Sequence, residues 1–136
     1  MLAVLDAGPL YAAVDRDDDD HERCVDVLAS GDLDVVVPAL VVAEVTYMVG
    51  RRLGADVEAA FLRSLERLDV EAPAPQDWSR IGELVERYRE FPLGGTDASV
   101  VALAERLGTD LVVTLDHRHL AAVRPRHRAA FELLPD

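Results

Sequence analysis

Short apolar runs alternate along the chain with segments in which apolar residues recur at helical spacing. The runs have the length of strands, and they lie at Leu2–Leu5, Val35–Val37, Leu68–Val70, Leu111–Leu115 and Phe131–Leu134. The run Leu111–Leu115 is apolar on both faces, as expected of a strand that is covered by helices above and below. This alternation predicts βαβ units and a mostly parallel sheet.

Between the predicted strands, the apolar spacing indicates helices. They are expected at His21–Ala29, Ala39–Leu53, Ala55–Leu68, Trp78–Tyr88 and Thr96–Leu107. Gly108 follows the last of them, in the position where glycine commonly ends a helix. No repeat, low-complexity linker or domain boundary interrupts the pattern, so residues 1–136 are expected to form a single domain.

The composition indicates the cellular compartment in which the protein is expected. Cys24 is the single cysteine, so no intramolecular disulfide can form and a reducing cytoplasm is the expected compartment. The longest apolar stretch, Val35–Ala43, contains Pro38 and is far shorter than the ~20 residues that a membrane helix needs. Met1 leads directly into an apolar run without a basic segment, so neither a membrane span nor export is expected.

The charge of the chain at first argues against a nucleic acid partner. The formal net charge is -12, whereas proteins that bind phosphates usually carry a basic balance. All 14 basic residues are arginine. The absence of lysine excludes a P-loop lysine, a Schiff-base lysine and the lysine of a phosphorylated-aspartate site.

Two acids follow predicted strands directly. Asp6 comes after Leu2–Leu5, and Asp116 comes after Leu111–Leu115. In an open parallel sheet, the carboxyl ends of the strands beside the topological switch point line the binding crevice. If these two strands are neighbours there, both carboxylates face one cleft.

Two further acids lie among apolar residues of predicted helices. Glu44 has apolar neighbours three and four positions away on either side, and Asp97 lies in the first turn of its helix, where the helix dipole favours the ionised form. Each acid also has an ordinary structural explanation. Asp97 can cap its helix, Asp6 and Asp116 can accept backbone hydrogen bonds in turns, and Glu44 can pair with a buried arginine.

Taken together, four converging carboxylates would repel one another unless a divalent cation held them. Oxygen ligands suit Mg²⁺ or Mn²⁺, whereas zinc is disfavoured because no cysteine or histidine pair has ligand spacing. The histidines are expected in loops or near-terminal segments. The chemistry implied is hydrolysis of a phosphodiester, as in nucleases. Glycoside hydrolysis also uses paired carboxylates, but one tryptophan, three tyrosines and three phenylalanines give little for a sugar-binding cleft.

The order of these acids resembles that of the PIN-domain ribonucleases. The matching positions are Asp6, Glu44 in Val42-Ala43-Glu44-Val45, Asp97 in Thr96-Asp97-Ala98, and Asp116 in Thr114-Leu115-Asp116-His117-Arg118. Within that family, the chain is most similar over its whole length to the VapC toxins of type II toxin–antitoxin modules.

The resemblance implies a PIN-like three-layer α/β/α sandwich around a mostly parallel sheet of about five strands. It implies Mg²⁺ or Mn²⁺ bound by the four acids, Asp6, Glu44, Asp97 and Asp116, which would also be the catalytic residues. It further implies endonucleolytic cleavage of structured RNA such as tRNA or ribosomal RNA, a homodimer, and inhibition by a cognate antitoxin protein.

Two positions depart from the family pattern. A hydroxyl residue often follows the first aspartate by one or two places, where this chain has Ala7 and Gly8, so a hydrogen bond to Asp6 must be absent or come from elsewhere, with Thr114 as the candidate. The aromatic residue often found after the last motif is Leu120, which changes a local packing contact.

Other classes of protein fit less well. A receiver domain needs adjacent acids after the first strand and a lysine, and a haloacid-dehalogenase-type phosphatase needs a second aspartate at Gly8 and a lysine; the chain has none of these. A housekeeping nuclease of the same fold and a catalytically inactive module that binds RNA or protein stay open as alternatives.

The charge is unevenly distributed. Between Asp116 and Glu132 the sequence has no acid, and its basic residues there are Arg118, Arg124, Arg126 and Arg128. RNA is therefore expected to bind where the metal ions and this arginine segment meet. Arg118 and His119, beside the last acid, are predicted to hold RNA phosphates.

Overall fold

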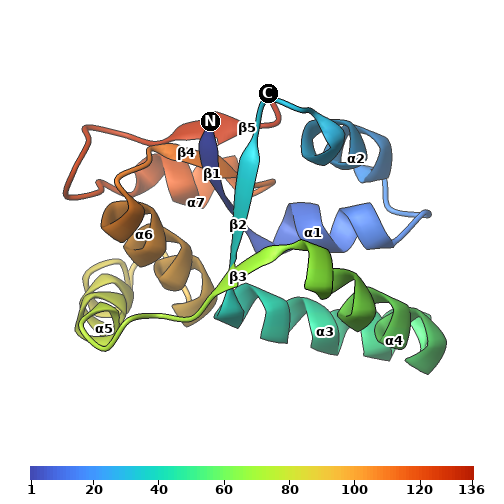
Figure 1. Ribbon diagram of the computed structural model, residues 1–136. Coiled ribbons are helices and arrows are strands. Elements are labelled where there is room, and N and C mark those ends of the chain that lie inside the picture. The colour runs from blue at the N-terminus through green and yellow to red at the C-terminus, as the bar shows by residue number, and fades with distance from the viewer.

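A five-stranded parallel sheet forms the centre of the computed structural model, which describes residues 1–136 (Figure 1). The strand order is β3-β2-β1-β4-β5, and every neighbouring pair is parallel. The strands are β1 (Leu2–Leu5), β2 (Asp34–Pro38), β3 (Asp69–Glu71), β4 (Leu111–Val113) and β5 (Glu132–Leu134). The chain builds outward from β1 to β3 and then returns to β4, so the strand order reverses between β1 and β4.

Helices cover both faces of the sheet. Figure 1 shows α1 to α4 on one side and α5 and α6 on the other, which confirms the predicted three-layer α/β/α architecture. The helices are α1 (Ala7–Val14), α2 (His21–Ala29), α3 (Ala39–Leu53), α4 (Ala55–Ser64), α5 (Asp77–Arg87), α6 (Gly95–Leu107) and α7 (His117–Ala122), and a 3₁₀ turn spans Leu65–Arg67. None of these helices has both the length and the apolar character needed to cross a bilayer.

The core is densest around β1, β4 and α6. Ala3, Val4 and Leu5 of β1 are buried, as is all of β4. In α6 every residue from Ala98 to Ala104 is buried, because the helix is apolar on all sides and is enclosed by the sheet, α3 and α5. Asp97 therefore lies at the first turn of a deeply buried helix.

The two short helices α1 and α7 were not predicted from the apolar spacing of the sequence. In α1 the side chain of Asp6 accepts a hydrogen bond from the amide of Ala7, and Pro9 is tolerated because amides in the first turn of a helix have no partner within it. In α7 Asp116 caps the first turn by accepting from the amide of His119. The histidines were expected in loops or near-terminal segments, but His21 is the first residue of α2, and His117 and His119 lie in the short helix α7.

Candidate active site

The sheet topology brings the first and the last acid together. β1 and β4 are hydrogen-bonded neighbours, with Leu5 paired to Val113, and the amide of Asp6 donates to the Val113 carbonyl at 2.9 Å. Both acids thus leave the sheet at its carboxyl edge, beside the point where the strand order reverses. The predicted neighbourhood of Asp6 and Asp116 is confirmed.

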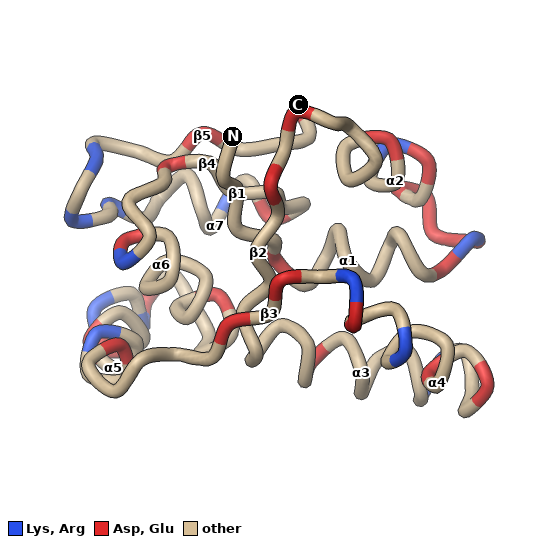
Figure 2. The backbone as a smooth tube through the Cα atoms, viewed as in Figure 1, with Lys and Arg blue, Asp and Glu red and all other residues tan.

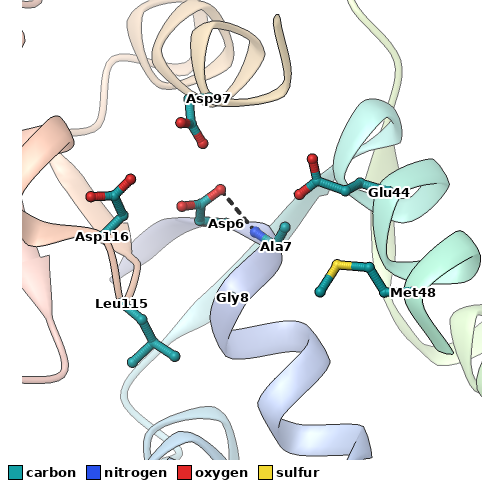
Figure 3. Close-up of a pocket in the computed structure, with 8 residues that line it drawn as sticks. All are labelled: Asp6, Ala7, Gly8, Glu44, Met48, Asp97, Leu115 and Asp116. Atoms are coloured by element: carbon teal, nitrogen blue, oxygen red, sulfur yellow. Dashed lines mark hydrogen bonds between the residues drawn. The ribbon is translucent and has the colours of Figure 1, made fainter. Parts of the chain in front are cut away.

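An open pocket of about 420 Å³ lies at this edge, and all four predicted acids line it. Figure 3 shows that the acids come from four elements of the fold and that their carboxylates surround a common space, with Asp6 in the middle. The lining residues are Asp6, Ala7, Gly8, Glu44, Met48, Asp97, Leu115 and Asp116. No lysine or arginine is among them.

Asp6 is the most deeply buried of the four acids, with 4% of its surface exposed. Its carboxylate accepts two hydrogen bonds, from the amide of Ala7 and from the hydroxyl of Thr114, both at 2.8 Å. Burial raises the pKa of Asp6 above its ordinary value, although these two hydrogen bonds act in the opposite direction. The carboxylate is therefore held in a fixed orientation at the floor of the pocket.

Thr114 supplies the hydroxyl group that Ala7 and Gly8 lack. This fully buried side chain donates to Asp6 Oδ2 and accepts from the amide of Asp116 at 2.9 Å. One threonine therefore links the carboxylate of the first acid to the backbone of the last. The candidate named from the sequence occupies the expected position.

Replacing Thr114 with Val is expected to lower the free energy of unfolding by about 1–3 kcal/mol, because the isosteric side chain leaves one oxygen of Asp6 and the amide of Asp116 without a partner. Urea denaturation measures this change. Thr114→Ser keeps the hydroxyl and serves as the control. Equal stability of the Val and Ser variants would show that the two hydrogen bonds contribute nothing.

Asp97 carries the most perturbed carboxyl group of the pocket. Its carboxylate accepts no hydrogen bond from the protein, and burial, reinforced by the charges of Asp6, Asp116 and Glu44, raises its pKa to about 7. The favourable dipole of α6 does not offset these effects. A carboxyl group perturbed in this way within a pocket is typical of functional sites.

Glu44 reaches the pocket, but not from a buried face. The core stripe of α3 consists of Val41, Val45 and Val49, whereas Glu44 is exposed and Tyr47 beside it is 67% exposed. The expectation that Glu44 lies on a buried apolar face is therefore wrong. Of the apolar residues three and four positions away, only Val41 is buried, whereas Leu40, Tyr47 and Met48 are partly or fully exposed.

Asp116 is half-exposed at the opposite wall of the pocket. Its Oδ1 accepts from the amide of His119 at 3.1 Å and lies 2.8 Å from Nδ1 of the same residue. His119 in turn packs against Phe91, which no motif in the sequence singled out. Leu120, where the family often has an aromatic residue, is fully buried in the core.

The donor set of the pocket fits a hard divalent cation. As the side chains are placed, no three His, Cys, Asp or Glu residues lie close enough together to hold one metal ion. The chemistry nevertheless matches, since four carboxylates that repel one another face a common space and no arginine pairs with any of them. Their oxygens are ligands that Mg²⁺ and Mn²⁺ prefer.

The predicted arginine segment is largely engaged elsewhere in the fold. Arg126 pairs with Glu83 at 3.0 Å, and Arg128 lies 3.7 Å from Asp110. Two of the four arginines at which RNA is expected to bind therefore form ion pairs within the chain, because acids of α5 and of the turn before β4 lie next to them. Figure 2 shows the basic positions of this part of the chain on the loop that precedes β5.

A family model and a sequence relative both match nearly the whole chain. Residues 3–124 match the family model described as PIN domain. The chain is 33% identical over 137 aligned positions to the ribonuclease VapC26 of Mycobacterium tuberculosis, a match that covers 97% of this chain and 99% of the relative.

Solved structures share the fold at lower sequence identity. The sarcin–ricin loop cleaving toxin VapC20 of Mycobacterium tuberculosis superposes with a TM-score of 0.80 at 20% identity, over 88% of this chain and 94% of that one. A toxin–antitoxin complex from Klebsiella pneumoniae gives a TM-score of 0.68 at 16% identity, over 89% of this chain and 92% of that one.

Proposed function

The chain belongs to the PIN-domain family, and on this basis we propose that it is a metal-dependent endoribonuclease that acts as the toxin of a toxin–antitoxin pair. The observation that carries the proposal is the convergence of four carboxylates, Asp6, Glu44, Asp97 and Asp116, on one open pocket without a basic side chain in its lining. The relative that matches nearly the whole chain is named a ribonuclease.

The four carboxylates would together hold Mg²⁺ or Mn²⁺. When bound, such an ion supplies two things to a nuclease site: activation of water and stabilisation of the charge that develops on the phosphodiester. The protein contributes orientation. Thr114 and the amide of Ala7 fix the carboxylate of Asp6, and His119 contacts that of Asp116. Burial and the charges of Asp6, Asp116 and Glu44 raise the pKa of Asp97, and a bound cation would offset these charges.

The substrate class that we propose is structured RNA, such as tRNA or ribosomal RNA. The pocket is open, and Arg118, two residues after the lining residue Asp116, is exposed and has no ion pair within the chain, so it can contact phosphates. The likeness to a toxin described as cleaving the sarcin–ricin loop supports this class.

The proposed partners are a cognate antitoxin protein and a second copy of the chain. The antitoxin is supported by the fold shared with a toxin–antitoxin complex and by the relationship to VapC26. The homodimer rests on the family resemblance.

Expression of the chain in bacterial cells is expected to arrest growth and to create new RNA 5′ ends at a small number of positions, which sequencing of RNA ends identifies. Asp6→Asn at equal expression serves as the inactive control. Coexpression of a small protein encoded beside this gene should restore growth. New RNA ends that the neighbouring protein does not suppress would indicate a housekeeping nuclease, and the absence of new ends would contradict RNA cleavage.

A further inference from the structure

The ring of Phe91 connects two parts of the molecule at the margin of the acidic pocket. Phe91 lies in the segment between α5 and α6 and contacts the first turn of α7. Its ring centroid is 4.6 Å from that of His119, with the planes at 46°, and 5.3 Å from Cζ of Arg118. A single aromatic side chain thus contacts two consecutive residues of α7, Arg118 and His119.

Arg118 differs from the arginines that form ion pairs within the chain. Five arginines pair with carboxylates, namely Arg23, Arg80, Arg106, Arg126 and Arg128. Arg118 is exposed and has neither an ion pair nor a hydrogen bond within the chain, and its contact is the face of Phe91. Because no hydrogen bond or ion pair within the chain engages the guanidinium, its N–H groups are free for a bidentate acceptor such as a phosphate.

This unpaired guanidinium lies close in the sequence to an acid of the pocket. Asp116, two residues earlier, lines the pocket, and Asp116 is also contacted by His119, the second residue that packs on Phe91. The ring of Phe91 therefore contacts both Arg118 and His119, and His119 in turn contacts the pocket acid Asp116. No acid lies within ion-pair distance to neutralise Arg118.

We propose that Phe91 is a positioning residue of an RNA-binding subsite, in which its ring holds the Arg118 guanidinium at the margin of the pocket to bind a backbone phosphate next to the cleaved one. This inference rests on the proposed ribonuclease function. Phe91 acts through Arg118 and does not touch the reacting atoms. The ligand is the phosphodiester backbone, so the subsite contributes affinity irrespective of the base at that position.

A double-mutant cycle tests the coupling between the ring and the guanidinium. The probe is a fluorescein-labelled RNA hairpin, bound in Mg²⁺ buffer by the full chain carrying Asp6→Asn, which suppresses cleavage. Phe91→Leu, which keeps an apolar side chain, is expected to weaken binding by about 2- to 5-fold, the range for an exposed cation–π contact. Arg118→Ala should weaken binding more strongly and lower the salt slope by about 0.7 to 0.9.

The decisive measurement is RNA affinity when Phe91→Leu is combined with Arg118→Ala. In that background Phe91→Leu should no longer weaken binding. A ring with only a structural role would weaken binding by the same factor in both backgrounds, which would overturn the proposal. Phe91→Tyr keeps the ring and should bind as Phe91 does. If Phe91→Leu lowers the melting temperature, Phe91→Met provides the same comparison.

A matched control exists on α5. Arg87 is also exposed and lies over an aromatic ring, that of Tyr88, with Cζ 5.8 Å from the centroid, but it does not line the pocket. Arg87→Ala should leave RNA affinity and the salt slope close to those of the parent chain, and an effect equal to that of Arg118→Ala would show that general charge, not this subsite, is measured.

Cleavage by chains without the Asp6→Asn change separates this inference from the proposed function. Phe91→Leu should raise KM and leave kcat nearly unchanged, because uniform binding is lost. Normal cleavage with no effect of Phe91→Leu on KM would overturn the subsite and leave the ribonuclease intact. Absence of cleavage together with absence of hairpin binding would overturn both.

Discussion

Replacing Asp97 with Asn is expected to reduce RNA cleavage by roughly 10³-fold or more, equivalent to about 4 kcal/mol of transition-state stabilisation, and at the same time to make the metal-free protein more stable. The loss follows because one of four converging carboxylates is removed. The gain follows because burial and the charges of Asp6, Asp116 and Glu44 oppose ionisation of Asp97. A residue that serves function but lowers stability shows this opposite pair of effects.

The gain in stability should depend on pH in a defined direction. The pKa of Asp97 is raised to about 7 in the folded state from 3.8, so the folded state holds this proton more tightly than the unfolded state does. The contribution of Asp97 to the free energy of unfolding therefore falls between about pH 4 and pH 7 and stays reduced above pH 7. After allowance for solvent screening, we expect the Asn variant to gain roughly 1 kcal/mol at pH 8, or about 4 °C in melting temperature, and nothing below pH 4.

Thermal melts in metal-free buffer across this pH range measure the effect. Asp19→Asn, at an exposed acid far from the pocket in sequence and without an ion pair, is the control and should shift neither cleavage nor the melting temperature. A markedly lower melting temperature for Asp97→Asn at pH 8 would contradict the account, since it would mean that Asp97 stabilises the fold.

A divalent cation is expected to raise the melting temperature of the wild-type chain and to have a much smaller effect on Asp97→Asn. Binding to the folded state alone stabilises it by about 2.7 kcal/mol at a free ion concentration one hundred times Kd. Burial and then the charges of Asp6, Asp116 and Glu44 raise the pKa of Asp97, and a bound cation would offset the part that comes from these charges. Mg²⁺ and Mn²⁺ should act alike, because the donors are carboxylate oxygens.

The measurement is a melt at pH 8 with increasing MgCl₂ or MnCl₂, with NaCl at the same ionic strength as the control for screening. Asp19→Asn should respond as the wild type does. An equal shift for the wild type and Asp97→Asn, or a shift reproduced by NaCl, would show that the cation does not bind at these carboxylates.

The sequence predicts the acids of the sheet edge better than those of the helices. Asp6 and Asp116 follow apolar runs directly, and a parallel sheet places the ends of neighbouring strands together, so their convergence could be foreseen. Glu44 lines the pocket but does not lie on the buried face of α3, because only Val41 among the apolar residues three and four positions away is buried. Apolar spacing alone does not tell a core stripe from the flank of a helix.

What the sequence could not show depends on contacts between distant segments. The α7 helix has six residues, too few for a periodic pattern, and its start is defined by the hydrogen bonds of Asp116. The contact of Phe91 with Arg118 joins positions in separate elements, and nothing in the local sequence of either indicates it. The pairing of Arg126 with Glu83 is equally remote, which is why a basic segment looked free in the sequence.

Cleavage of a defined structured RNA by the purified chain, with and without a chelator, tests the central claim most directly. If Asp6, Glu44, Asp97 and Asp116 form one metal-dependent nuclease site, cleavage should disappear in EDTA and return when Mg²⁺ or Mn²⁺ is added in excess, while Asp97→Asn from the same purification stays inactive throughout. Cleavage that persists in EDTA, or that Asp97→Asn retains at the wild-type rate, would contradict the claim.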